Sequence, residues 1–296
     1  MPYSPIPIPQ IRAGGANLQM KIDSQLVKEL REKTGAGILA CKKALQKTDG
    51  DIEAAIDILR AEGAAKAAKR ESKEAREGLI RLRISDDAKK AALLELNCET
   101  DFVTRTDDFS AMADRLLDTL FTDGPDALAG EEIQEELTAA AARIGEKITI
   151  GRALLWNKDG YIGGYLHHNS RVASLVELTE KLPETGRVIA MQVAASNPTY
   201  LGETDIPAEE KEREMAIFRE QIKDKPEAIQ DKILGGKWRK HLTGLCLLNQ
   251  PFLHDDKIKV SDYLKKQETP SGEPVALKEF VRWKLGEGGG REVVSA

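Results

Sequence analysis

Few side chains in this sequence have the type and spacing that catalysis or metal binding requires. His167 and His168 are adjacent, and adjacent side chains of a strand point to opposite faces, so the two rings are not expected to share a metal ion. His241 and His254 are isolated. Paired carboxylates occur in contexts typical of turns and helix starts, where capping and solvation explain them: Asp86–Asp87, Asp107–Asp108 and Asp255–Asp256. The sequence therefore predicts neither a catalytic residue nor a metal site.

Sequence motifs for nucleotide binding and hydrolysis are missing as well. The chain has no GxxxxGKS or GxxxxGKT phosphate loop, no GxGxxG, no HExxH and no GxSxG. Its cysteines, Cys41, Cys98 and Cys246, lie far apart without CxxC spacing, which favours a reducing compartment over a disulfide framework or a zinc site. We therefore expect a protein that is not an enzyme with covalent chemistry, binds no cofactor and acts by contact with a partner.

Length and charge limit the class of protein further. A chain of 296 residues is long enough for about two domains. Residues 79–206 carry 13 basic and 22 acidic residues, an excess that argues against a phosphate-backbone cradle there. Residues 1–20 lack the apolar region of a secretory signal and are expected to be a disordered leader, and no stretch is apolar enough to span a membrane. One arginine in that leader is poor support for a transit peptide, so the cytoplasm is favoured over an organellar matrix.

Residues 21–63 have the spacing of three short amphipathic helices. Apolar residues recur three and four positions apart in three groups: Leu26, Val27 and Leu30, then Ile38, Cys41 and Leu45, then Ile52, Ala55, Ile56 and Leu59. Asp51 is expected to cap the third helix and Gly63 to end it. Residues 64–78 are rich in Ala, Lys, Arg and Glu, which is typical of a solvated helical linker.

After Gly78 the apolar period changes to two, and the pattern then recurs. At a constant offset of 82, the residues Gly78, Ile80, Ala91, Leu93, Glu95 and Leu96 match Gly160, Ile162, Ala173, Leu175, Glu177 and Leu178. A helical pattern follows each unit. The simplest architecture is an α+β core of two similar subdomains, residues 79–156 and 157–290, with a tail at 291–296.

Residues 207–238 are strongly charged, with sparse apolar positions and a dividing Pro226. A protruding antiparallel helical hairpin suits this composition, because it needs only a narrow apolar seam. The expected seam consists of Met215, Ile217, Phe218, Ile222, Ile229 and Ile233. From Leu242 onward we expect another helix, a short helix at 260–266 and a final strand near 280–285.

Several segments combine residues that periodicity alone does not require. They are LVKELREKTGAGILACKKAL at residues 26–45, DGDIEAAIDILR at 49–60 and ELNCETDFVTRTDDF at 95–109, followed in order by HHNSRVASLVEL, MQVAASNPTYL, LLNQPFL and LGEG. Over residues 21–290 the chain resembles the elongation factor Ts family. The resemblance implies an N-terminal UBA-like module of three helices, a linker helix and a core of two similar α+β subdomains with an inserted helical hairpin.

The same resemblance implies a partner and a mode of action. Family members bind the translational GTPase elongation factor Tu, in its GDP form and its nucleotide-free form, and promote GDP release and GTP rebinding. An Asp-Phe pair is pushed into the GTPase domain near the bound Mg²⁺. In this chain that role falls to Asp101 and Phe102, at the centre of the segment formed by Thr100, Asp101, Phe102 and Val103.

Two further groups of contact residues follow from the resemblance. His168 and Arg171 match a second contact with the GTPase domain, although Asn169 and Ser170 stand where the family has small, glycine-rich residues, and Gln192 replaces a histidine. In the N-terminal module the exposed candidates for partner contact are Thr34, Gly35, Gly37, Lys42 and Lys43.

The main alternative is an RNA-binding or ribosome-associated adaptor. It would use the small helical module and the basic stretch from Lys66 to Arg76, and its RNA affinity would depend steeply on salt. The acidic core and the lack of an aromatic stacking platform argue against direct nucleic-acid binding.

Overall fold

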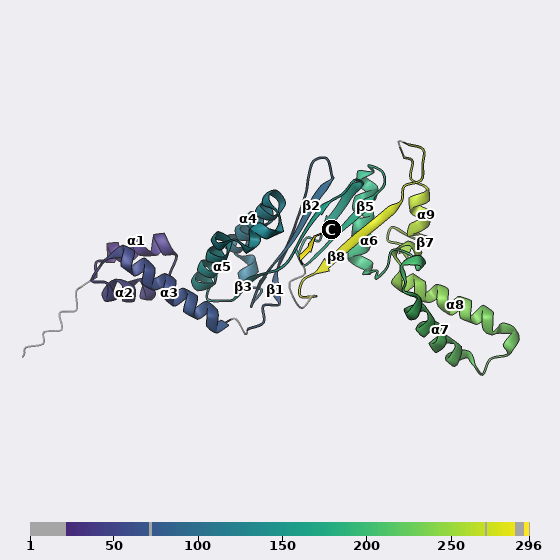
Figure 1. The fold of residues 1–296 in the computed structure, drawn as a ribbon, viewed down its shortest axis with the longest axis horizontal. Helices are drawn as coiled ribbons and strands as arrows, with labels where there is room; N and C mark the ends of the chain where they lie inside the picture. The colour runs from purple at the N-terminus through teal and green to yellow at the C-terminus, as the bar shows by residue number, and fades with distance from the viewer. Residues whose placement is uncertain (1–21, 71–72, 270, 288–292, 296) are drawn as a thin grey trace, which may run out of the picture. The chain divides into compact units, whose positions relative to one another are not determined.

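The computed structural model describes residues 22–70, 73–269, 271–287 and 293–295, and the leader expected at residues 1–20 lies outside them. The chain divides into two compact units, Met1–Ala68 and Lys69–Ala296 (Figure 1). Each unit has an apolar core of its own. The combination of helices with mainly antiparallel sheets confirms the predicted α+β class.

The first unit is a module of three helices, α1 (Ser24–Thr34), α2 (Ile38–Lys47) and α3 (Ile52–Arg70). Asp23 caps α1 by accepting a hydrogen bond from the backbone N of Gln25 at 2.9 Å. The Asp51 carboxylate accepts from the backbone N of Ala54 at 3.1 Å at the start of α3, as its position in the sequence predicted. The buried core comprises Leu30, Cys41, Ala44, Leu45 and Ala55.

Two details of this module differ from the sequence prediction. Gly63 does not end the third helix, because α3 continues to Arg70. A glycine inside a helix costs only about 1 kcal/mol relative to alanine, and the alanines and glutamate around Gly63 are strong helix formers. Ile38 does not join the core and is 57% exposed, since it begins α2 while Ala36 in the preceding turn packs against the core.

The second unit is built on two sheets. The first has the strand order β1-β2-β3-β9, with β1 (Glu77–Ile84), β2 (Lys90–Cys98) and β3 (Ile148–Asn157) antiparallel and β9 (Val293–Ser295) parallel to β3. The second has the order β4-β5-β8, with β4 (Tyr161–Leu166), β5 (Val172–Leu178) and β8 (Leu277–Lys284). Residues 293–295 thus form a strand where the sequence predicted a tail.

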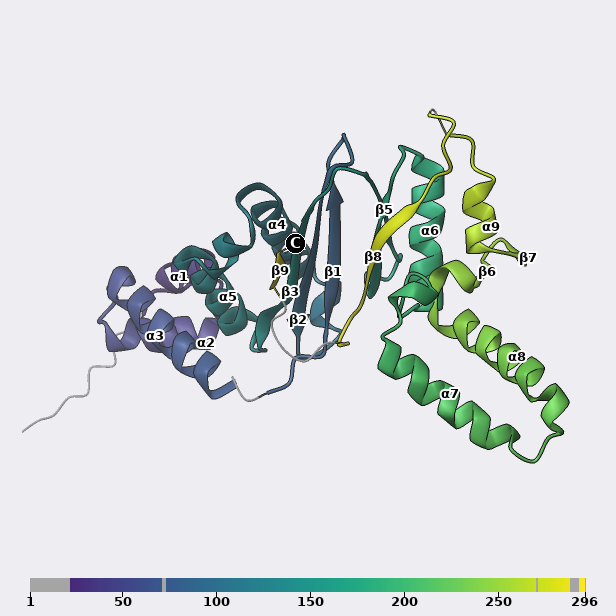
Figure 2. The ribbon, with the colours of Figure 1, turned by 45° about the vertical axis from the view of Figure 1, so that its right-hand side comes forward.

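The two sheets face each other, and helices cover their outer faces (Figure 2). Trp156 and Leu93 of the first sheet share an apolar cluster with Leu175 and Trp283 of the second. Helices α4 (Asp107–Asp123) and α5 (Glu131–Ile144) pack on the first sheet, and α6 (Pro183–Ser196) packs on the second. Helix α9 (Val260–Lys265) joins the apolar cluster around α6. Residues 91–98 of β2 are buried along their whole length, which explains their nearly continuous apolar run.

The repeat seen in the sequence is also a repeat of strand pairing. In β1–β2, Ile80 pairs with Glu95, and in β4–β5, Ile162 pairs with Glu177, each at the offset of 82. The register with the third strand shifts after Glu95 in one copy and after Glu177 in the other. The prediction of two similar subdomains is therefore confirmed down to the position of an irregularity in the ladder.

A helical hairpin of α7 (Ala208–Ile222) and α8 (Glu227–Leu245) is inserted between α6 and β6 (Pro251–Phe252) (Figure 2). Met215 and Phe218 of its predicted seam pack with Trp238, but Ile217 and Ile229 are 44% and 43% exposed. Because α8 continues to Leu245, the separate helix expected from Leu242 is the end of the hairpin itself.

Short elements complete the unit. They are strand β7 (Asp255–Lys259) and the 3₁₀ helices η1 (Val103–Arg105), η2 (Pro125–Ala129), η3 (Glu203–Asp205) and η4 (Leu247–Asn249). Within the described residues, no helix combines the length and the apolar composition that crossing a membrane would take.

Candidate functional site

The connection between β2 and α4 carries the central segment identified in the sequence. It runs from residue 99 to residue 106 and contains the short helix η1. Phe102 is 75% exposed on this connection, whereas the next residue, Val103, is buried in the core beneath α4. The loop therefore presents one large apolar ring to solvent from a base that is anchored in the fold.

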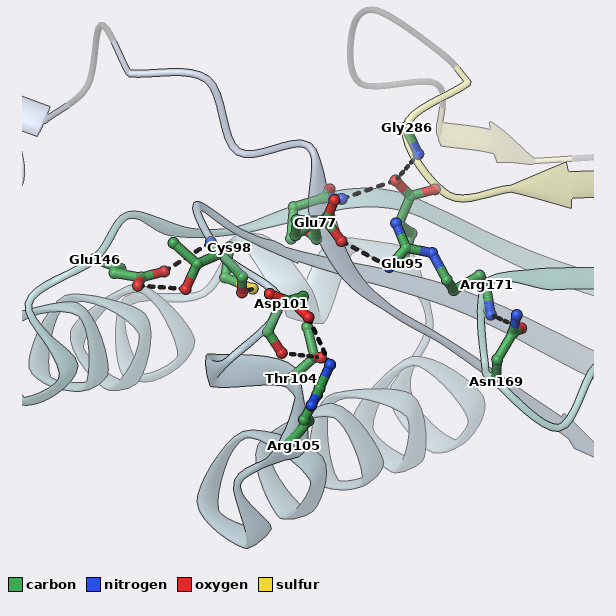
Figure 3. Close-up of polar contacts among 12 residues, drawn as sticks. Glu77, Glu95, Cys98, Asp101, Thr104, Arg105, Glu146, Asn169, Arg171 and Gly286 are labelled. Carbon is green, nitrogen blue, oxygen red and sulfur yellow. Dashed lines mark hydrogen bonds and ion pairs between the residues drawn. The ribbon is translucent and has the colours of Figure 1, made fainter.

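Asp101 precedes this ring and is bonded within the loop. Its Oδ2 pairs with Nη2 of Arg105 at 2.7 Å, and its backbone carbonyl accepts from Oγ1 of Thr104 at 2.7 Å (Figure 3). The side chain of Asp101 remains 43% exposed and that of Arg105 is 74% exposed. An exposed pair of this kind contributes at most about 1 kcal/mol, so the carboxylate can exchange its partner at little cost.

Thr100 joins the loop to the rest of the subdomain. Its backbone N donates to Oε2 of Glu146 at 2.9 Å, and its hydroxyl donates to Oε1 of the same carboxylate at 2.7 Å. Its carbonyl accepts from Sγ of Cys98 at 3.1 Å. Burial raises the pKa of the Cys98 thiol to about 12, so the thiol stays protonated at neutral pH and serves as a donor rather than a nucleophile.

The turn between β4 and β5 brings the second group of predicted residues to the same place. His168 is exposed in this turn, and Nη1 of Arg171 pairs with Oε2 of Glu77 at 2.7 Å. The hydrogen bond to Glu77 raises the pKa of Arg171. Oδ1 of Asn169 accepts from the backbone N of Arg171 at 3.0 Å (Figure 3). Between them, Ser170 adopts a left-handed φ of 55°.

A hollow of about 410 Å³ lies between the two segments. Asp101, Thr104 and Arg105 line it from the β2–α4 connection, and the β4–β5 turn contributes His168 and Arg171. The fold thus brings together predicted contact residues that lie in different subdomains. Arg81 forms part of the floor, where its Nε donates to Oδ1 of Asp114 at 2.7 Å and its Nη1 to Oγ of Ser170 at 3.3 Å.

The histidine pair differs from the sequence prediction. The ring centroids of His167 and His168 lie 4.1 Å apart, because the residues belong to the turn and not to a strand, where their side chains would have diverged. No group of three or more His, Cys, Asp or Glu side chains suited to a metal ion occurs among the residues that the structure describes.

Comparison with known proteins identifies the family. Residues 99–287 match the family model described as elongation factor TS, beginning at the connection that carries Asp101 and Phe102. The chain belongs to the elongation factor Ts family. An elongation factor Ts of Prosthecochloris aestuarii is 40% identical over 285 residues, which cover 90% of this chain and 99% of the relative. That of Aquifex aeolicus is 39% identical over 292 residues, covering 91% and 99%. Membership of the elongation factor Ts family makes the chain a factor of translation elongation in protein biosynthesis.

The N-terminal residues predicted from the elongation factor Ts resemblance belong to the first unit, and the hollow belongs to the second. Thr34 ends α1 with its hydroxyl donating to the carbonyl of Leu30 at 2.7 Å, and Gly35 has the left-handed φ of 65° that a helix end favours. Gly37 precedes α2 at the N-cap position, and Lys42 and Lys43 are exposed on α2.

Sequence reasoning missed residues at both places. In the module, Leu39 is 75% exposed beside the exposed Ile38, and the run of apolar residues after Gly37 was the available signal, since it is wider than one helix face. In the second unit, Arg81 at the hollow and Glu146 beside Thr100 have partners 33 and 46 residues away, and no local pattern marks such contacts.

Proposed function

We propose that this chain binds elongation factor Tu and accelerates the release of GDP from it, so that GTP can rebind. The observation that carries the proposal is the arrangement of Phe102, a 75% exposed ring on a loop anchored on both sides, directly after Asp101. A ring presented in this way can enter a partner as an apolar wedge, with the carboxylate carried in beside it.

The effect on the nucleotide follows from electrostatics. A bound Mg²⁺ screens the phosphates of GDP, and an intruding carboxylate competes for the groups that hold the metal. Asp101 suits this role because its existing partner, Arg105, is exposed and weakly bound. Displacing the metal weakens the hold on the phosphates, and no covalent step is involved.

Linkage limits what the factor can do to the nucleotide equilibrium. If the factor weakens GDP binding, GDP weakens factor binding by the same ratio. The factor therefore binds both the GDP form and the nucleotide-free form of elongation factor Tu and shortens the lifetime of the nucleotide without changing the overall equilibrium. Excess GTP in the cell then determines which nucleotide rebinds.

The remaining predicted residues fit contacts that hold the partner. His168 and Arg171 line the same hollow as Asp101, and they form the second contact with the GTPase domain. In the module, the exposed Lys42 and Lys43 and the turn from Thr34 to Gly37 form a separate contact. Two contacts on one chain raise the effective concentration of the wedge at its target.

Stopped-flow release of a fluorescent GDP analogue from elongation factor Tu tests the proposal. We expect the native chain to accelerate release by orders of magnitude and the double variant Asp101→Ala, Phe102→Ala to lose most of the acceleration. Leu253→Ala is the matched control, since it removes an apolar side chain that is 48% exposed in the β6–β7 turn. No acceleration by the folded native chain with its matched partner would refute the assignment.

A further inference from the structure

The turn after α5 holds the loop that carries Asp101 and Phe102. Both oxygens of the Glu146 carboxylate accept hydrogen bonds from Thr100, at 2.9 Å from its backbone N and at 2.7 Å from its hydroxyl (Figure 3). The next residue of the turn, Lys147, donates its backbone N to Oε1 of Glu99 at 2.8 Å. Three hydrogen bonds therefore join this turn to the two residues before Asp101.

The local sequence places Glu146 for this contact. Helix α5 ends at Gly145, whose left-handed φ of 83° reverses the chain, and β3 begins soon after with the buried Ile148. Glu146 is thus fixed between a helix end and a central strand. A carboxylate accepts stronger hydrogen bonds than a neutral group, so the position and the charge both favour a firm hold on Thr100.

The segment formed by Asp101 and Phe102 is anchored at both of its ends. Before it stands Thr100, bound by Glu146, and after it stands Val103, buried in the core. Phe102 itself packs against little, because most of its surface is in solvent. The direction in which the ring points is therefore set by its anchors, and an unanchored loop would have to lose conformational entropy at the moment of insertion.

We propose that Glu146 is a positioning residue for nucleotide exchange, which keeps the loop in the conformation that inserts into the partner. The inference rests on the proposed function. Glu146 acts through Thr100 and has no contact with the nucleotide, so its loss affects the insertion step more than docking, which uses other surfaces. In kinetic terms, the maximal rate of GDP release falls while the factor concentration at half-maximal rate changes little.

The test compares Glu146→Ala with Glu146→Gln, using Glu135→Ala as a control on the exposed face of α5, the helix that precedes Glu146. GDP release from elongation factor Tu is measured as a function of factor concentration. For Glu146→Ala we expect the maximal rate to fall by about tenfold or more, the change expected from losing a hydrogen bond to a charged group. Glu146→Gln retains an acceptor for the backbone N of Thr100 and should recover part of the rate. The control should match the native chain.

A second pair of variants tests whether the effect passes through Thr100. Thr100→Val removes the hydroxyl bond and Thr100→Ser keeps it, so the first should lower the maximal rate and the second should preserve it. In the double variant Thr100→Val, Glu146→Ala, the losses should be smaller than additive, because both changes break the same contact.

Three results would overturn the inference. One is a maximal rate of GDP release for Glu146→Ala that equals that of the native chain, while the double variant Asp101→Ala, Phe102→Ala is inactive. Another is a loss seen only as a lower melting temperature with unchanged activity per folded molecule. The third is unchanged amide hydrogen exchange at residues 99–103 in Glu146→Ala, which would show that the contact does not hold the loop. If the native chain fails to release GDP, the proposed function fails first, and the hydrogen-exchange result still decides whether Glu146 orders the loop.

Discussion

The two copies of the repeated unit share a scaffold and differ in the connection that leaves their second strand. The connection after β2 spans residues 99–106, includes a 3₁₀ turn and exposes Phe102. The connection after β5 spans residues 179–182 and is tied to the chain before β8, where Thr179 and Ala276 exchange two hydrogen bonds of 2.9 Å. The connection after β2 exposes an aromatic ring to solvent, whereas the connection after β5 is hydrogen-bonded to the chain before β8.

The contact between the copies is reciprocal. The backbone N of Ile80 donates to the carbonyl of Ser170 at 2.7 Å, and the equivalent N of Ile162 donates to the carbonyl of Ala88 at 2.8 Å. Ser170 and Ala88 both have a φ of 55°. Each hairpin turn is therefore bonded to the first strand of the other copy, as two equivalent partners would be in an isologous contact.

The comparison shows how the two ends of a repeated scaffold come to differ. At one end, the turn that carries His168 meets the longer connection with Asp101, and the two enclose the hollow. At the other end, the turn at residues 85–89 is bonded to the turn before β4, where the backbone N of Lys158 donates to the carbonyl of Lys89 at 2.9 Å. The strands fix where the two ends lie, and the connections decide which end has the exposed ring and the hollow.

The largest stability difference between the copies should come from their equivalent glutamates. Glu95 is buried with Arg152, whose Nε lies 2.8 Å from Oε2 and whose Nη2 donates to the carbonyl of Lys284 at 2.9 Å. We expect Arg152→Met to lower the free energy of unfolding by about 3–5 kcal/mol, because the buried carboxylate loses its cationic partner and keeps the neutral donors Asn97 and Gly286. Urea unfolding followed by circular dichroism measures the change.

The matched change in the other copy is Lys278→Met. Lys278 is 46% exposed, and its partner Glu177 also accepts from the backbone N of Gly160 at 3.0 Å, so the expected loss is below about 1 kcal/mol. If Arg152→Met does not fold, the pair Glu95→Met, Arg152→Met should recover much of the stability, since replacing both members of a buried pair is often nearly neutral. Equal losses in the two copies would contradict the comparison.

The next largest effect on stability is expected where the backbones of β4 and α6 approach each other closely, a contact found in only one of the two copies. A Cβ added at Gly163 of β4 would lie 2.6 Å from backbone atoms of Gly186 in α6, whereas the equivalent position in β1 holds Arg81. We expect Gly163→Ala to destabilise the second unit by about 1–3 kcal/mol, because backbone atoms cannot move aside cheaply. Gly235→Ala in α8 meets nothing within 4 Å and should stabilise by up to about 1 kcal/mol. The same urea titration distinguishes opposite signs, and a loss in both variants would refute the packing argument.

Much of the scaffold could be predicted from the sequence, because strands, helices and the repeat leave local or periodic patterns of apolar residues. The offset of 82 between Ile80 and Ile162 predicted two similar units, and the strand registers repeat at that offset. Alternation likewise predicted β1, and the helical pattern after the first copy of the repeated unit predicted α4. These patterns work where a residue's environment is set by its near neighbours in the chain.

The site could be predicted only in part, because several of its residues are held by contacts between segments that are distant in the sequence. Asp101 and Phe102 lie in a motif, but the anchor of their loop, Glu146, is distant in sequence and has an ordinary turn context. Arg81 alternates on β1 like any solvent-facing residue, and its contacts with Asp114 and Ser170 come from packing between elements. Such contacts form only in the folded chain and leave no local pattern in the sequence.

The smallest effect on stability is expected at the helix starts that follow the two connections, the N-termini of α4 and α6. Oγ1 of Thr106 accepts from the backbone N of Phe109 at 3.4 Å at the start of α4, whereas α6 begins after Leu182 with no side-chain cap and has Pro183 in its first turn. Thr106→Ala should lower the free energy of unfolding by about 1 kcal/mol, and Thr106→Ser should restore it. Because Thr106 also donates to the carbonyl of Val103 at 2.8 Å, the same change should loosen the anchor behind Phe102 and slow GDP release modestly. A stability loss with an unaltered release rate would show that Glu146 and Val103 hold the loop without help from the cap.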